Sequence, residues 1–278
     1  MEPLSTSVIV GTTAMLGNKA VKIFEDLIYR RIYGFSREEL DASNKEKAKD
    51  IIAVKEATRD LIVKSEIIKI QREYKNLGKT LSLASPYITS EENKIKEEND
   101  FFWGILEHSK KISNEEMQVL ISKIVAGEYN NPETYSMSTL QVLKSVDGKL
   151  LNNFTKILGV CLIGIGIIQD IFSDVEDMKK LDVSYSHFLE LQNIGLICAN
   201  VSEIETDKDT TGVYISKQVH FIPKDKTKKM VIPSFYSLTR AGREIARHLN
   251  IKENPNFIGW LKDEYKDNDY RNFDIETR

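Results

Sequence analysis

The stretch that most constrains the fold is residues 113–143, "SNEEMQVLISKIVAGEYNNPETYSMSTLQVL", which predicts two helices joined by a polar turn. Ser113 and Glu116 have the spacing of a capping box, in which each side chain bonds a backbone N–H at the start of a helix. Apolar residues then recur at intervals of three and four, as one buried helix face requires: Met117, Leu120, Ile121, Ile124 and Val125. Gly127 is expected in the left-handed conformation that closes this first helix.

The turn and the second helix follow directly. Asn130, Asn131 and Pro132 do not continue a helix and supply turn chemistry. Ser136 or Ser138 is expected to cap the second helix, whose apolar residues are Met137, Leu140, Val142 and Leu143. The sequence therefore predicts a well-defined helical hairpin, and this hairpin carries no catalytic constellation.

This block resembles the signature of an uncharacterised bacterial family of the domain-of-unknown-function type, and a similar block occurs in Abi-alpha abortive-infection proteins. The positions that match are Ser113, Glu115, Glu116, Met117, Gln118, Leu120, Ala126, Gly127, Glu128, Pro132, Ser136, Thr139 and Leu140. The family usually has Trp where this chain has Ile121, so an aliphatic residue replaces a large aromatic anchor. The resemblance extends over about residues 60–250. It implies an all-helical body, a bacterial or phage-related origin and a role in phage defence, and it implies no known active site.

The composition is that of a soluble globular protein, with 41% apolar and 29% charged residues among 278. A net charge of −3 argues against a generic polyanion binder, although a local basic patch can still bind one. Cys161 and Cys198 lie in apolar runs, which favours buried, reduced thiols over a disulfide. The four His are not spaced with Cys as zinc ligands are, so we expect no metal site and no cofactor. Glu2 and the lack of a positively charged start favour a cytoplasmic location over secretion.

Residues 1–35 are predicted to form an amphipathic helix, with apolar positions at Val21, Phe24, Leu27, Ile28 and Ile32. Peripheral contact of residues 8–33 with a membrane is one interpretation, because the pair Arg30–Arg31 suits lipid headgroups. We favour packing on the protein body instead, since the acidic pair Glu25–Asp26 weakens attraction to a membrane surface.

Residues 36–172 are predicted to form the helical body, which includes the hairpin. Its first part has no Gly or Pro from Ile51 through Leu77, which predicts one long helix over residues 45–82. Such a helix also suits self-association, so a homo-oligomer formed through it is one expectation. The segment around Asn76 is similar to the family's long-helix pattern, which favours a packing role for its polar residues.

A dozen uncharged residues, Ile157–Ile168, form an apolar run late in the body. A transmembrane helix needs about 20 such residues, so this run is too short to cross a bilayer. A buried helix and a buried strand remain, because periodicity does not separate them. We expect a buried helix, which packs closely against a neighbour or bends at Gly159, Gly164 and Gly166.

Residues 173–250 differ from the helical body. A helix at about 183–193, a Gly195 cap and a strand at about 196–201 precede two alternating runs, "VYISKQVHFIP" and "VIPSFYSL". The stretch "LTRAGREIARHL" then opens a last helix at Thr239. The two alternating runs predict a β-ribbon. The order of elements resembles the winged-helix module of bacterial transcription factors, so we expect a winged-helix-like module here.

Eight basic residues gather in and after this predicted ribbon and form the candidate contact site for nucleic acid or a partner: Lys217, Lys224, Lys226, Lys228, Lys229, Arg240, Arg243 and Arg247. On a wing and a last helix they would suit phosphate contacts. The expected recognition helix, "VSYSHFLELQNIG", carries Glu190 and neither Lys nor Arg, whereas a DNA reader normally places donors there. We therefore favour a protein interface or a solvated charged surface over DNA binding.

Residues 251–278 form a charged tail. Phe257 and Trp260 are its large apolar residues, and we expect them to dock on the preceding module. The last residues of the tail are expected to stay loose, as chain ends often do.

The sequence contains no phosphate loop, nucleophile elbow, zinc-helix motif or dinucleotide fingerprint, so it indicates no enzyme. The predicted fold is mainly α, with a multi-helix body followed by a winged-helix-like α+β module. The favoured function is that of a non-catalytic bacterial interaction protein in phage defence, of the abortive-infection kind, which binds an unknown protein partner or assembles. A winged-helix DNA-binding regulator that uses the basic wing is the alternative. A metal-dependent nuclease without a local motif is the third interpretation.

Overall fold

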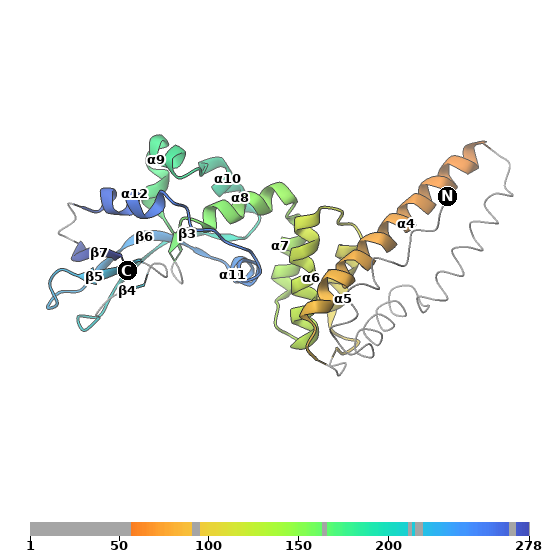
Figure 1. The fold of residues 1–278 in the computed structure, drawn as a ribbon, viewed down its shortest axis with the longest axis horizontal. Coiled ribbons are helices and arrows are strands. Elements are labelled where there is room, and N and C mark those ends of the chain that lie inside the picture. Colours follow the sequence, from red (N-terminus) through yellow and green to blue (C-terminus); the bar gives the residue numbers. More distant parts are fainter. Residues whose placement is uncertain are drawn as a thin grey trace. The chain divides into compact units, whose positions relative to one another are not determined.

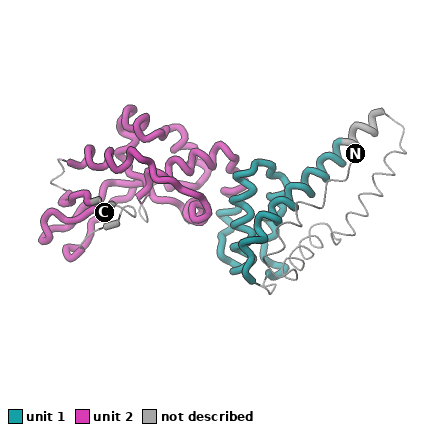
Figure 2. Tube along the Cα trace, in the orientation of Figure 1, with its two compact units in different colours: residues 1–140 teal, residues 141–278 magenta. Residues whose placement is uncertain are grey.

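The computed structural model describes residues 57–90, 95–162, 166–210, 213–214, 219–266 and 271–277. The chain divides into two compact units, residues 1–140 and residues 141–278 (Figure 2). The described residues are mainly helical, with nine α-helices and seven short strands among them (Figure 1). The N-terminal helix predicted for residues 1–35, the first part of the predicted long helix and Lys217 lie outside the described residues.

Unit 1 is built from helices. Its elements are α4 (Ala57–Ala84), the 3-10 turn η1 (Ser85–Tyr87), α5 (Asp100–Ser109), α6 (Glu115–Asn130) and the first residues of α7 (Met137–Ser145). The long helix is confirmed in its described part as α4, which packs against α5 and α6. The core of the unit is apolar and fully buried, with Leu77 of α4, Phe102 and Ile105 of α5, and Ile121, Ile124 and Val125 of α6.

The two helices predicted on either side of the polar turn are confirmed as α6 and α7, but the first of them is capped by a different residue. The side chain of Asn114 caps α6 by accepting the Met117 N–H at 2.9 Å, whereas the capping-box spacing predicts Ser113 for this role. The Ser113 hydroxyl instead accepts from the side-chain amide of Asn76 at 3.2 Å. A contact from α4 therefore occupies Ser113, and the next residue provides the cap.

Gly127 lies inside α6, which continues to Asn130, so the predicted left-handed cap at this residue is wrong. The ring of Tyr135 lies against the Gly127 backbone, and a Cβ at this position would stand 3.3 Å from the Tyr135 Cζ atom and closer to the hydroxyl. Gly127 is therefore required for close packing and not for a turn. The helix ends instead just before Pro132, as the turn chemistry predicts.

Unit 2 contains two antiparallel sheets and six α-helical or 3-10 segments in its described part (Figure 1). The first sheet has the order β1 (Cys161–Leu162), β2 (Gly166–Ile168), β6 (Val231–Leu238) and β3 (Ile197–Glu205). The second has the order β4 (Val213–Tyr214), β5 (Val219–Pro223) and β7 (Phe273–Thr277). The helical segments are α8 (Gly148–Leu158), η2 (Gln169–Phe172), α9 (Val175–Lys180), α10 (Tyr185–Asn193), α11 (Arg240–Ala246) and α12 (Phe257–Glu264). Unit 2 thus includes residues before and after the stretch 173–250 that the sequence predicts as a module.

Three local predictions in this unit are confirmed, and one contact joins two of them. The predicted helix at 183–193 is α10, and Gly195 follows it with a φ of +85°. The last predicted helix, α11, is capped by Thr239, whose hydroxyl accepts the Gly242 N–H at 3.0 Å. The same hydroxyl donates to the Gly195 carbonyl at 2.6 Å, so the start of α11 is bonded to the turn after α10.

The buried helix predicted for Ile157–Ile168 is wrong. α8 ends at Leu158, and Cys161–Leu162 and Gly166–Ile168 of the run form the antiparallel strands β1 and β2. The backbone of Gly166 lies so close to the carbonyl of Tyr236 on β6 that no Cβ would fit there. The apolar residues of the run are buried in this sheet, with Leu162, Ile167 and Ile168 inaccessible to solvent. β2 lies between β1 and β6 and is buried. This agrees with the alternative prediction for the run, a buried strand.

The two alternating runs do not pair with each other, so the predicted ribbon is wrong. β6 pairs with β2 and β3, whereas β5 pairs with β4 and β7.

The tail supplies one of the two partners of β5. Strand β7 of the tail places Ile275 opposite Phe221 of β5. Docking of Phe257 and Trp260 is confirmed, since both are buried. The expectation of loose last residues is wrong, because they supply this strand.

Candidate functional site

The basic loop, residues 224–229 between β5 and β6, carries four of the candidate cations: Lys224, Lys226, Lys228 and Lys229. Asp225 shapes this loop from inside. Its Oδ1 accepts the Thr227 N–H at 2.9 Å and the Thr227 hydroxyl at 2.6 Å. These hydrogen bonds, and then the charge of Lys228, lower the pKa of Asp225. The Asp225 carboxylate therefore accepts both the N–H and the hydroxyl of Thr227 within the loop itself.

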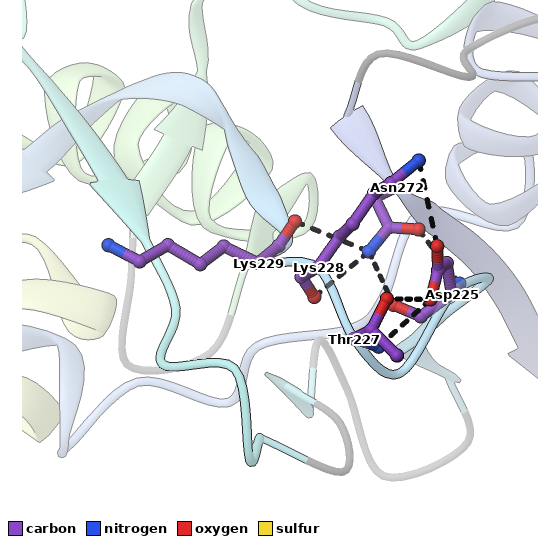
Figure 3. Close-up of polar contacts among 5 residues, drawn as sticks. All are labelled: Asp225, Thr227, Lys228, Lys229 and Asn272. Carbon is purple, nitrogen blue, oxygen red and sulfur yellow. Dashed lines mark hydrogen bonds and ion pairs between the residues drawn. The ribbon is translucent and has the colours of Figure 1, made fainter.

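Asn272, the residue before β7, clamps the basic loop (Figure 3). Its Nδ2 donates to the carbonyls of Asp225, Lys228 and Lys229 at 2.8, 3.0 and 3.3 Å. Its Oδ1 accepts the Asp225 N–H at 2.8 Å. Asn272 is 5% exposed and has a φ of +54°, a conformation that Asn adopts more readily than most residues. One buried amide near the end of the chain thus determines the shape of the loop.

Three of the four lysines in the basic loop lie beside carboxylates. Lys224 is 3.9 Å from Asp274, Lys228 is 3.6 Å from Asp225, and Lys229 is 3.5 Å from Glu205. Lys226 is exposed and has no ion pair in the described part of the chain. These carboxylates reduce the positive potential that a phosphate backbone would meet at the loop.

The three candidate arginines belong to a different part of unit 2. Arg240 pairs with the buried carboxylate of Glu244 at 2.8 Å, and Arg243 donates to the Leu238 carbonyl at 2.6 Å. Arg247 follows the last residue of α11 and is exposed. No hydrogen bond or ion pair of the described residues joins these arginines to the basic loop, and α11 lies away from β5 and β7 in Figure 1. The structure therefore does not bring the described candidate cations into one site.

The exposed face of α10 has a different composition. Tyr185 and Leu189 are 47% and 39% exposed, and they lie one helical turn apart. Ser186, Glu190 and Asn193 complete the exposed side, and the helix has neither Lys nor Arg. The opposite side is buried through Phe188 and Leu191. The helix thus presents apolar and acidic side chains to solvent.

Four aromatic rings, which we call the aromatic patch, extend from this face into the unit: Phe172, Tyr185, Phe188 and Tyr236. The buried ring of Phe188 is the base, with centroids 4.2 Å from Phe172 and 4.8 Å from Tyr236 on β6. Tyr185 stacks on Phe188 at 6.1 Å and forms the outer rim. Tyr236 lies opposite Val201 in the β3–β6 register, and Val201 is exposed. The patch therefore continues from α10 across β6 to β3.

The signature block is the stretch of residues 113–143 that resembles the family signature. Its structural role is centred on Glu128, which is fully buried. Its Oε1 accepts from the Asn99 side chain at 2.8 Å and from the Glu133 N–H at 2.7 Å. Its Oε2 accepts the Tyr135 N–H at 3.2 Å. Glu133 has a φ of +67°, so this carboxylate holds a turn in a conformation that costs energy for a non-glycine residue.

The first turn of α6 contains three further signature residues. Gln118 is buried, and its Nε2 donates to the Ile112 carbonyl at 2.9 Å. Met117 is buried in the core, and Glu116 is exposed at the helix start, where a negative charge is favourable. These side chains fix the entry of the chain into α6.

The start of α7 contains the last signature residues. The Ser136 hydroxyl accepts the Thr139 N–H at 3.4 Å, and the two hydroxyls lie 3.0 Å apart. Thr139 is buried, and Pro132 stands in the turn between the helices. Ser136 is therefore the cap of α7, which decides between the two predicted serines.

Among the described residues, no group of three or more His, Cys, Asp or Glu is placed to hold a metal ion. None of the helices described here is both long and apolar enough to cross a membrane. Cys161 and Cys198 are free and half-buried, and burial raises the pKa of the Cys161 thiol to about 12.

A sequence model of the family described as "Protein of unknown function (DUF2806)" matches residues 64–262, which is well over half of the chain. The chain belongs to this family. The predicted membership of an uncharacterised domain-of-unknown-function family is thereby confirmed. No curated protein and no solved structure matches the chain.

The DUF2806 match runs from α4 in unit 1 to α12 in unit 2. It includes the signature block, α10 and the basic loop, and it ends before Asn272 and β7. The clamp on the basic loop is therefore provided by a part of the chain beyond the matched residues.

Sequence reasoning missed Asn272, Phe172 and Tyr236. Asn272 contacts a loop 47 residues earlier, and its only local signal is that Asn favours turns and positive φ values. Tyr236 lies in a run that was correctly predicted as a strand, but no local pattern indicates that α10 packs on it. Contacts between distant segments determine all three roles.

Proposed function

We propose that this chain is a non-catalytic interaction protein that binds a protein partner through the exposed face of α10. The composition of that face carries the proposal. Tyr185 and Leu189 are exposed one helical turn apart, and the helix has neither Lys nor Arg. Aromatic residues are enriched at protein interfaces, whereas a surface that contacts nucleic acid needs positive charge.

A winged-helix-like interpretation of unit 2 supports this choice of surface. When β1, η2, β4 and β5 are set aside, the order α8, β2, α9, α10, β3, β6 follows that of a winged helix, and β6 lies between β2 and β3 in the sheet. The long connection from β3 to β6 takes the place of the wing. In this arrangement α10 corresponds to the recognition helix, the element that most directly contacts a ligand.

DNA binding through the basic loop is the second candidate, and the exposed Lys226 and Lys228 favour it. The carboxylates beside Lys224, Lys228 and Lys229 weigh against it. A duplex titration separates the two functions. Nanomolar, salt-dependent binding that disappears when the four lysines become Ala would favour the DNA-binding regulator.

A role in phage defence is part of the proposal and is supported only by the resemblance of the signature block to Abi-alpha proteins. We expect a bacterium that carries the gene to plate at least one phage less efficiently than the same strain without it. The variant Leu189→Ser should lose this protection. Equal plating of all phages tested would remove the role in defence and leave the interaction proposal standing.

A photo-crosslinking experiment tests the interaction proposal. A photoreactive phenylalanine analogue at position 189 should give a discrete protein adduct in cells. The same group at Ile251, which is 41% exposed in the same unit, is the matched control and should not give that adduct. Identical adducts from both positions, or none from position 189, would contradict a partner surface on α10.

A further inference from the structure

We draw no further inference here: the strongest candidate, the aromatic patch of Phe172, Tyr185, Phe188 and Tyr236 beside the exposed face of α10, belongs to the site already described, and nothing in the structure shows what covers it.

Discussion

Each unit contains one loop that is held by a single buried polar side chain, and the two side chains come from very different distances. In unit 1, Glu128 bonds the N–H groups of Glu133 and Tyr135, five and seven residues further along the chain. In unit 2, Asn272 bonds the basic loop from 47 residues away. A local clamp forms together with its own helix, whereas a distant clamp forms only after the end of the chain has folded. The turn of unit 1 is thus a property of the hairpin, and the basic loop is a property of the whole second unit.

The two units also differ in what their polar side chains contact. The clamped turn of unit 1 lies in the signature block, and the contacts described above for that block serve packing or a helix end. The basic loop and the aromatic patch of unit 2 have exposed side chains with unused polar groups. We therefore expect substitutions in the first unit to change the free energy of unfolding and those on α10 to change binding.

The largest effect is expected from Glu128→Ala. This change leaves the Tyr135 N–H without an acceptor in the core and also removes the part-buried hydrogen bonds to the Glu133 N–H and the Asn99 amide, so it should cost about 3 kcal/mol. Urea denaturation of the full chain measures it. Glu116→Ala is the matched control, because Glu116 is an exposed glutamate of the same helix and should cost far less. A cost below about 1 kcal/mol for Glu128→Ala would contradict the local clamp.

The contrast between local contacts and contacts from distant segments also explains which parts of the fold could be predicted. Cap residues, apolar spacing and turn residues are local signals, and they located α6, α7, α10, Gly195 and the start of α11. The two strands in Ile157–Ile168 depend on contact with β6, and β7 depends on β5, so no local pattern indicates them. Among the candidate site residues, the basic loop and the lack of cations on α10 could be read directly. The clamp by Asn272 and the aromatic patch required the packing of distant segments.

A smaller effect is expected from removing the distant clamp. Asn272→Ala loses the side-chain hydrogen bonds to Asp225, Lys228 and Lys229 and should cost about 2 kcal/mol. Part of this cost arises because Ala is unfavourable at a φ of +54°. Asn272→Gly tolerates that φ, so the cost that remains in the Gly variant measures the amide contacts. Hydrogen exchange should increase in the basic loop and β5 but not in unit 1. Unchanged exchange in the basic loop would show that the clamp does not determine its shape.

The helix cap of the signature block gives a third, still smaller effect. Asn114→Ala removes the acceptor of the Met117 N–H and should cost about 1 kcal/mol. Ser113→Ala should cost less, because Ser113 contributes only a part-buried contact with Asn76, whose amide also donates to the Lys110 carbonyl at 2.9 Å. Chemical denaturation of the two variants in parallel compares neighbouring residues in one background. A larger cost for Ser113→Ala would restore the capping box that the spacing predicts.

The smallest effect concerns the pH dependence of the basic loop. Hydrogen bonds from Thr227 lower the pKa of Asp225 from its ordinary value of 3.8, so folding favours the ionised carboxylate. The stabilising contribution is therefore fully present above that ordinary value and is lost as the pH falls through the lowered value of the folded state. The amide signal of Thr227 should move with this titration, because the Thr227 N–H donates to the Asp225 carboxylate. In Asp225→Asn the Thr227 amide should no longer titrate, and the loop should stay clamped because Asn272 bonds the backbone of residue 225 and not its carboxylate. If loop order were lost in Asp225→Asn at neutral pH, the inner carboxylate and not the distant amide would hold the loop, and the contrast between the two units would disappear.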